Sequence, residues 1–160
     1  MSASRPSAGV DPAVVLDAHD RAIIEALQED GRRPVTHIAR AVGLSEAAVR
    51  QRVNRLIDSG VMQIVAVTDP LSLGYHRMAM VGLRVGGGVH SVAEKVGALE
   101  EVAYVVYTAG SFDLLVEVVT ADDEALLALL NDRIRAIPGV IGTETFVYLR
   151  IAKQTYAWGA

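Results

Sequence analysis

Arginine, glutamine and asparagine side chains follow closely after Gly43, and these side chains can read base edges and hold phosphates. Ala39, Gly43 and Val49 have the spacing of a helix-turn-helix, in which a small residue allows close helix crossing, glycine takes the turn and a β-branched residue locks the second helix. The N-terminal end of that helix enters the major groove. We therefore predict a DNA interface formed by Ser45, Glu46, Ala47, Arg50, Gln51, Arg52, Asn54 and Arg55.

The predicted roles differ along this helix. Arg50 and Gln51 are close enough to its start to read base edges, whereas Arg52, Asn54 and Arg55 lie further along and are expected to hold phosphates. The competing interpretation is three packed helices whose arginines form only a solvated face.

A glycine turn, Gly110-Ser111-Phe112-Asp113, is the second group with useful chemistry. Its backbone N–H groups suit a carboxylate, and Asp113 suits an ammonium group. The hydroxyls of Thr143 and Thr145 can complete the hydrogen bonds. We therefore predict binding of an amino acid or a similar small zwitterion, the alternative being an ordinary hairpin turn capped by Asp113.

Other chemistry finds no support in the sequence. The four histidines have no helix-face metal spacing, and no Ser/His/Asp arrangement can be picked out. The chain has no cysteine, which excludes disulfides, thiolate zinc sites and a cysteine nucleophile. We expect no catalytic residue, no metal site and no cofactor, and we interpret the glycines of residues 86–88 as a connector because GxGxxG spacing is absent.

Three helices are predicted to position the first group. The first covers residues 16–27 with Asp17 and Asp20 at its start, the second covers residues 35–42, and Ser45 caps the third, which Gly60 closes. The third helix is expected to turn Val49, Val53, Leu56 and Ile57 inward. A β-branched strand over residues 64–67 would then make this a winged helix-turn-helix domain.

The rest of the chain predicts an α+β domain of order βαββαβ. The expected strands cover residues 78–85, 102–108, 113–119 and 140–149, and the expected helices cover residues 89–99 and the segment opened by Asp122. The second helix carries Leu126, Leu127, Leu130, Ile134 and Ile137 at helical spacing. The order indicates a ferredoxin-like antiparallel sheet with both helices on one face, and its other, apolar face is expected to pair with another subunit.

Composition agrees with this division. The 160 residues are 51% hydrophobic with a net charge of −4, so DNA binding must come from local clustering of charge. We assign residues 1–15 to a disordered tail, 16–69 to the DNA-binding domain, 70–77 to a linker and 78–160 to the oligomerisation and effector-binding domain. Apolar runs are too short to cross a membrane, and the tail is unlike a secretory signal, so a cytoplasmic protein with no membrane partner is expected.

An ordered set of segments resembles the Lrp/AsnC family, the feast/famine regulators. They are LDAHDRAIIEALQEDGR, IARAVGLS, VRQRVNRLIDSGVM, TAGSFDLLVEV, IRAIPGV and GTETFVYL. The resemblance implies a transcription regulator that binds double-stranded DNA, pairs through its sheets as a homodimer and assembles into rings, often octamers. It implies an amino-acid pocket where dimers meet, matching Tyr107, Thr108, Ala109, Gly110, Ser111, Phe112 and Asp113, followed by Thr143 and Thr145.

Two alternatives stay open. The siroheme decarboxylases look like the same family, which would make His76 and Arg77 a candidate pair for tetrapyrrole chemistry. The other alternative is an effector-sensing co-regulator that oligomerises with a DNA-binding relative and has little DNA binding of its own.

Overall fold

The structure, a computed structural model, describes residues 15–153 in two compact units, residues 15–66 and residues 67–153. All of the expected tail except Val15 lies outside the described residues, as do the last seven residues of the expected C-terminal domain. Each unit has its own hydrophobic core and is considered by itself.

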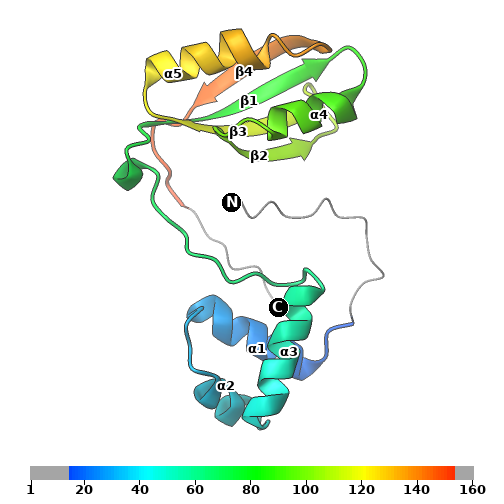
Figure 1. Ribbon diagram of the computed structural model, residues 1–160, viewed down its shortest axis with the longest axis vertical. Coiled ribbons are helices and arrows are strands. Elements are labelled where there is room, and N and C mark those ends of the chain that lie inside the picture. Colours follow the sequence, from blue (N-terminus) through cyan, green and yellow to red (C-terminus); the bar gives the residue numbers. More distant parts are fainter. Residues whose placement is uncertain (1–14, 154–160) are drawn as a thin grey trace. The chain divides into compact units, whose positions relative to one another are not determined.

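The N-terminal unit consists of α1 (Ala18–Glu29), α2 (Val35–Val42) and α3 (Glu46–Asp58) (Figure 1). Asp17 caps α1 in a capping box with Asp20, which confirms the predicted start signal. Ser45 caps α3 by accepting a hydrogen bond from the N–H of Ala48. The helices bury a small core: Ile23, Ile24, Ala26, Ile38, Ala39, Val49 and Leu56.

The strand expected over residues 64–67 is not formed in the described chain, so that strand prediction is wrong. A strand requires a ladder partner, and this extended segment has none within the described residues. Ile64 instead lies near the loop between α1 and α2, because its Cγ2 would be 3.7 Å from a Cβ placed on Gly31.

The C-terminal unit is a four-stranded antiparallel sheet with strand order β2-β3-β1-β4. Its elements are η1 (Leu71–Leu73), β1 (Arg77–Val85), α4 (Val89–Gly97), β2 (Val102–Tyr107), β3 (Leu114–Thr120), α5 (Asp123–Ala128), the π-helical η2 (Leu129–Ile134) and β4 (Val140–Val147) (Figure 1). This order and topology confirm the predicted ferredoxin-like domain.

The core lies on one face of this sheet. Alternate residues of β1 and β3 point into it, and α4, α5 and η2 supply the opposing side chains: Val92, Ala93, Val96, Leu126, Leu129, Leu130 and Ile134. Ile57 of α3, which was expected to point inward, is 39% exposed, and Leu127, from the apolar set at helical spacing, is 52% exposed. Neighbouring helix residues point about 100° apart, and buried Leu126 and Leu56 already occupy the inward direction.

The opposite face of the sheet carries no helix of the described chain. The register places Met80 between Glu117 and Phe146, and Gly82 between Leu115 and Glu144. Large apolar side chains stay accessible on this face, including Tyr104, which is 54% exposed, and Phe146, which is 45% exposed. We call this surface, formed by Met78, Met80, Tyr104, Val106, Leu115, Glu117, Val119 and Phe146, the open face.

Candidate DNA interface and effector-binding turn

The turn between α2 and α3 has the geometry that its residue types predict. Gly43 has φ +69°, a left-handed conformation that favours glycine, and no atom of the described chain lies within 4 Å of a Cβ placed there. Ala39 is 5% exposed and Val49 is fully buried, so the small residue and the β-branched residue both lie in the core where the helices meet. The helix-turn-helix is therefore formed as predicted.

Six of the eight predicted DNA-contacting residues are exposed on α3: Glu46, Ala47, Arg50, Gln51, Asn54 and Arg55. Ala47, Gln51 and Asn54 point away from buried Val49 and Leu56, because residues three and four apart share a helix face. The Arg50 guanidinium lies 3.7 Å from the Glu46 carboxylate, an exposed pair of modest strength. The Ser45 hydroxyl accepts the Ala48 N–H as the cap of α3.

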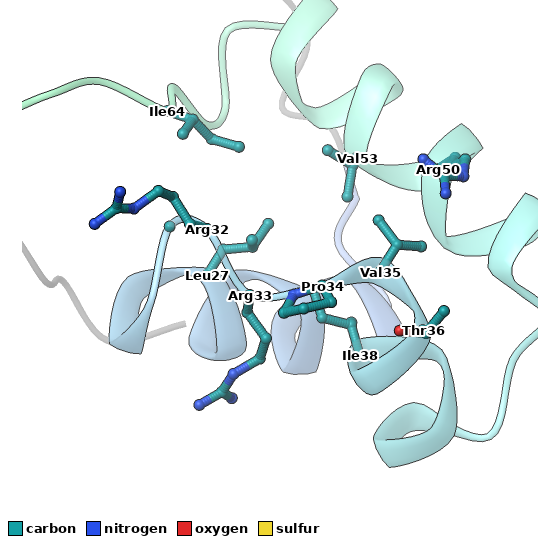
Figure 2. A pocket seen from close by; sticks show the side chains of 11 residues that line it. Leu27, Arg32, Arg33, Pro34, Val35, Thr36, Ile38, Arg50, Val53 and Ile64 are labelled. Carbon is teal, nitrogen blue, oxygen red and sulfur yellow. The ribbon is translucent and has the colours of Figure 1, made fainter.

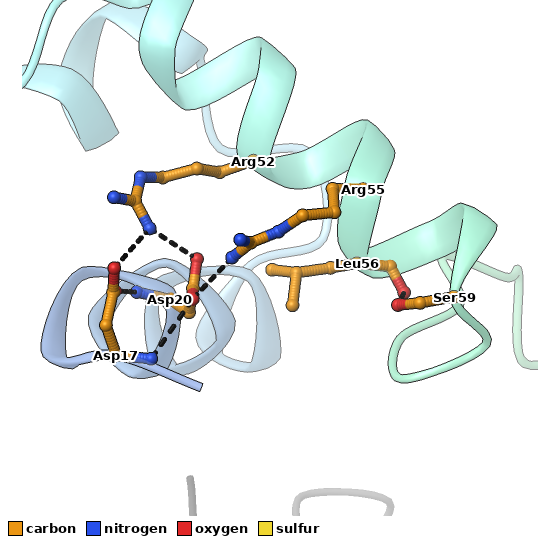
Figure 3. Close-up of polar contacts among 6 residues, drawn as sticks. All are labelled: Asp17, Asp20, Arg52, Arg55, Leu56 and Ser59. Carbon is orange, nitrogen blue, oxygen red and sulfur yellow. Dashed lines mark hydrogen bonds and ion pairs between the residues drawn. The ribbon is translucent and has the colours of Figure 1, made fainter. Parts of the chain in front are cut away.

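Arg52 and Arg55 have partners inside the unit. Arg52 Nη1 lies 2.7 Å from both Asp17 Oδ2 and Asp20 Oδ1, and Arg55 Nη2 lies 2.5 Å from Asp20 Oδ2 (Figure 3). Asp20 is 1% exposed, whereas the Arg55 side chain is 49% exposed. We call these four residues the Asp–Arg cluster. It joins the start of α1 to the middle of α3 and neutralises two charges that were expected to hold phosphates.

The Asp–Arg cluster keeps both carboxyl groups ionised. The N–H of Asp20 and the guanidinium of Arg52 lower the pKa of Asp17 to about 2. Burial opposes ionisation of Asp20, but hydrogen bonds from Arg52, the Asp17 N–H and Arg55 outweigh it and leave the pKa of Asp20 below its ordinary value. These interactions stabilise the folded unit at neutral pH.

The sequence analysis assigned helix caps to Asp17 and Asp20 and missed their contact with α3. The available signal was weak, since it consisted of two aspartates three positions apart on one helix and two arginines three positions apart on another. That spacing puts each pair on one helix face, but it does not indicate which faces meet.

A pocket of about 480 Å³ lies beside α3 in the same unit. Its walls are largely apolar, with Leu27, Val35, Val53 and Ile64 around the opening, and Arg50 stands at its edge (Figure 2). The side chains of Arg32 and Arg33 point away from the middle of the pocket (Figure 2). The pocket therefore borders the predicted DNA interface, but of the arginines in that interface only Arg50 lines the pocket.

The hairpin turn after β2 is held by its own hydrogen bonds. Thr108 donates from its N–H to Asp113 O at 3.0 Å and from Oγ1 to Phe112 O at 2.7 Å. Asp113 Oδ2 accepts the Val85 N–H at 2.7 Å, so this carboxylate ties the turn to the end of β1. No described atom lies within 4 Å of a Cβ placed on Gly110. Ala109, Gly110 and Ser111 are thus available on the surface.

Three other predicted effector residues have separate surroundings. The Tyr107 hydroxyl lies 3.1 Å from His90 Nδ1. Thr143 Oγ1 accepts a hydrogen bond from Arg135 Nε at 2.9 Å, and Thr145 is half-buried on β4. Among residues 15–153, no hydrogen bond joins either threonine to the turn.

Phe112 turns from the hairpin toward the open face. A Cβ on Gly82 would lie 2.7 Å from the Phe112 ring, so only glycine allows this close approach. The ring meets Phe146 edge to face, with 6.3 Å between centroids. The turn predicted to bind the effector and the open face are therefore in direct contact through one side chain, which the sequence pattern does not reveal.

His76 and Arg77, the pair considered for tetrapyrrole chemistry, have separate surroundings. Arg77 forms hydrogen bonds through Nε and Nη2 with the Asp123 carboxylate, and His76 is exposed. Within residues 15–153, no cluster of three or more His, Asp or Glu side chains has an arrangement suited to a metal ion. The same part of the chain contains no helix with the length and apolar character needed to span a bilayer.

Comparison with known families gives two matches that follow the two units. Residues 16–57 match the AsnC-type helix-turn-helix domain, and residues 78–158 match the Lrp/AsnC ligand binding domain. The second match alone covers more than half of the 160 residues.

Individual proteins are similar over nearly the whole length. The HTH-type transcriptional regulator FL11 of Pyrococcus furiosus is 38% identical, over 88% of this chain and 94% of its own. The leucine response regulatory protein of Mycobacterium tuberculosis is 29% identical, with a TM-score of 0.82 over 91% of this chain and 100% of that structure. A transcriptional regulator of Neisseria meningitidis in complex with L-Met has the same fold, with 24% identity and a TM-score of 0.81 over 90% and 96%.

Proposed function

This chain belongs to the Lrp/AsnC family and is a transcription regulator with a ligand-binding domain, and on that basis we propose how it uses DNA, effector and partner subunit. It binds a pseudo-palindromic site in double-stranded DNA through α3, as a homo-oligomer in the cytoplasm, under control of an amino acid. The observation that carries this proposal is the formed helix-turn-helix, with Ala47, Arg50, Gln51 and Asn54 exposed on one side of α3.

The start of α3 supplies sequence recognition. Arg50 and Gln51 are exposed and carry the donors and acceptors that discriminate base edges in the major groove. The N–H groups at the start of α3, next to Ser45 and Glu46, are suited to a phosphate at the groove edge. Asn54, which is exposed further along α3, contacts a phosphate in this proposal.

Subunits pair through the open face. A sheet that has helices on one face and apolar side chains on the other is stabilised by a second sheet, and two-fold pairing lets the same patch meet itself. This pairing brings two copies of α3 to one DNA site, which explains the pseudo-palindromic half-sites about one helical turn apart. Dimers then assemble further, with an octamer as the expected ring.

An amino acid binds beside the turn formed by residues 108–113. The carboxylate of Asp113 uses Oδ2 to accept the Val85 N–H, which leaves the lone pairs of Oδ1 for an ammonium group. Accessible backbone at Gly110 and Ser111 suits the ligand carboxylate. Phe112 contacts the open face, so occupation of this turn is transmitted to subunit pairing.

The test is selection of duplexes from a random library, carried out with and without each of the twenty amino acids. We expect an enriched motif with two-fold symmetry, and at least one amino acid that changes its enrichment. Calorimetry with that amino acid then measures binding directly, and linkage requires the DNA complex to bind it with an affinity altered by the same factor. A library that yields no motif would exclude sequence-specific binding.

A further inference from the structure

Resting on the proposed DNA binding, we propose that Asp20 is a positioning residue that withholds the guanidinium groups of Arg52 and Arg55 from DNA phosphates. Asp20 lies on α1 and is 1% exposed, while both arginines belong to the helix that reads DNA. Figure 3 shows the two guanidinium groups turned from α3 toward α1. The exposed face of α3, rather than its arginine-rich flank, is therefore left to meet DNA.

The Asp20 carboxylate accepts three hydrogen bonds from its neighbours. Oδ1 accepts from Arg52 at 2.7 Å, and Oδ2 accepts from Arg55 at 2.5 Å and from the Asp17 N–H at 3.1 Å. Arg52 is also held by Asp17 Oδ2 at 2.7 Å. Each arginine would therefore have to leave a short, charge-assisted hydrogen bond to reach a phosphate.

The energies favour retention of these contacts. Withdrawal of a cation from a buried carboxylate leaves an unpaired charge in a poorly solvated site, which is strongly destabilising. An exposed contact to a phosphate is weaker because solvent and salt screen it. The same cluster fixes the rotation of α3 against α1, because Arg52 and Arg55 contact Asp20 from two successive turns of α3.

The consequence is a DNA-binding surface with little free positive charge. Two arginines and two aspartates cancel within the Asp–Arg cluster, and Arg50 lies near Glu46. Non-specific affinity depends on the number of phosphates that the protein neutralises. This arrangement therefore lowers the affinity for non-specific DNA more than it lowers the affinity gained from base contacts. Loss of the Asp20 charge should release Arg55 to phosphates, and also Arg52 if it leaves Asp17, and should reduce specificity.

The salt dependence of binding distinguishes this role from a structural one. The affinity for a selected duplex and for a scrambled duplex is measured by fluorescence anisotropy from roughly 50 to 200 mM KCl, for the parent and for Asp20→Asn. Each released arginine should steepen the slope of log affinity against log salt by about 0.9, which is about a 3.5-fold greater loss of affinity across this range. A merely unfolded variant would lose binding without a steeper slope.

Asp58→Asn is the matched control, because it changes the charge equally at the exposed end of α3, where residues 15–153 provide Asp58 with no ion pair. We expect the Asp20→Asn slope to exceed the control slope by about 0.9 to 1.8. Equal slopes for the two variants would overturn the proposal.

Arg55→Gln in the parent background provides a test that does not depend on the folding of Asp20→Asn. In the parent background Arg55 is withheld from DNA, so Arg55→Gln should leave the salt slope within about 0.3 of the parent slope. In the Asp20→Asn background Arg55 is released, so the same replacement should reduce the salt slope by about 0.9. A loss of about 0.9 in the parent background would overturn the proposal by itself. Failure of the parent to prefer its selected duplex would instead count against the proposed function.

Discussion

The N-terminal unit buries a charged side chain, Asp20, while among the described residues of the C-terminal unit the buried polar side chain is the neutral Thr120. The first unit surrounds its carboxylate with two arginines and thereby fixes one helix against another. The second packs apolar side chains beneath its helices and leaves an apolar open face. This difference agrees with the proposal that the first unit presents α3 to DNA in one geometry and that the second pairs with another sheet.

The largest effect is expected from a charge on the open face. Met80 is half-buried at its centre, so Met80→Asp would place two carboxylates in a two-fold interface, where each unpaired charge costs several kcal/mol. We expect a monomer by light scattering at micromolar concentration. Leu127→Asp is the control, because Leu127 is 52% exposed on α5 and should leave the mass unchanged. A Met80→Asp variant with the parent's mass would contradict pairing through this face.

The next effect concerns base reading by α3. Arg50→Ala and Gln51→Ala should each weaken binding to the selected duplex by about 1 to 3 kcal/mol, with much less effect on a scrambled duplex. Competition between the two duplexes measures the difference. Arg21→Ala, an exposed arginine on α1, provides the matched loss of charge. Equal discrimination by parent and Arg50→Ala would remove the base-reading role of that residue.

Substitutions in the turn proposed to bind the effector should have a more modest effect. Gly110 has open space and no positive φ, so Gly110→Asp and Gly110→Ala should both fold. The aspartate adds a negative charge beside the ligand carboxylate and should weaken amino-acid binding at least tenfold, or about 1.4 kcal/mol, while alanine should have a smaller effect. Calorimetry at matched oligomeric state measures both. Unchanged binding in a folded, assembled Gly110→Asp variant would place the pocket elsewhere.

The smallest effect is the response of the N-terminal unit to acid. The pKa of Asp17 is lowered from 3.8 to about 2, and that of Asp20 is also lowered. A lowered pKa stabilises the folded state above the ordinary value, and this stabilisation is lost as pH falls through the folded value. Thermal unfolding followed by circular dichroism should therefore show a decline between pH 4 and pH 2.

Asp17→Asn should flatten part of this decline. Asp123 provides the comparison in the other unit, because the hydrogen bond from Arg77 lowers its pKa as well, although both side chains are more exposed. Asp123→Asn should therefore change the acid response less than Asp17→Asn. The reverse order would show that the Asp–Arg cluster contributes little to stability.

Local signals were sufficient for much of the fold. Asp17, Ser45 and Asp122 cap their helices as predicted, and Gly43 makes the left-handed turn. Such signals act within a few residues, so their spacing in the chain is also their spacing in the structure. The strand expected over residues 64–67 had β-branched residues but no partner in the described chain, and propensity alone does not supply a ladder.

The sequence by itself determined the three N-terminal helices, the βαββαβ order, the caps and most of the inward-facing positions, because periodicity and short-range hydrogen bonds are local. Only the tertiary structure decided that Arg52 and Arg55 meet Asp20, across 32 and 35 positions. It also placed the Phe112 ring against Gly82 on the open face. These contacts join residues far apart in the chain, and they depend on which surfaces pack together, which spacing along one helix or strand does not specify.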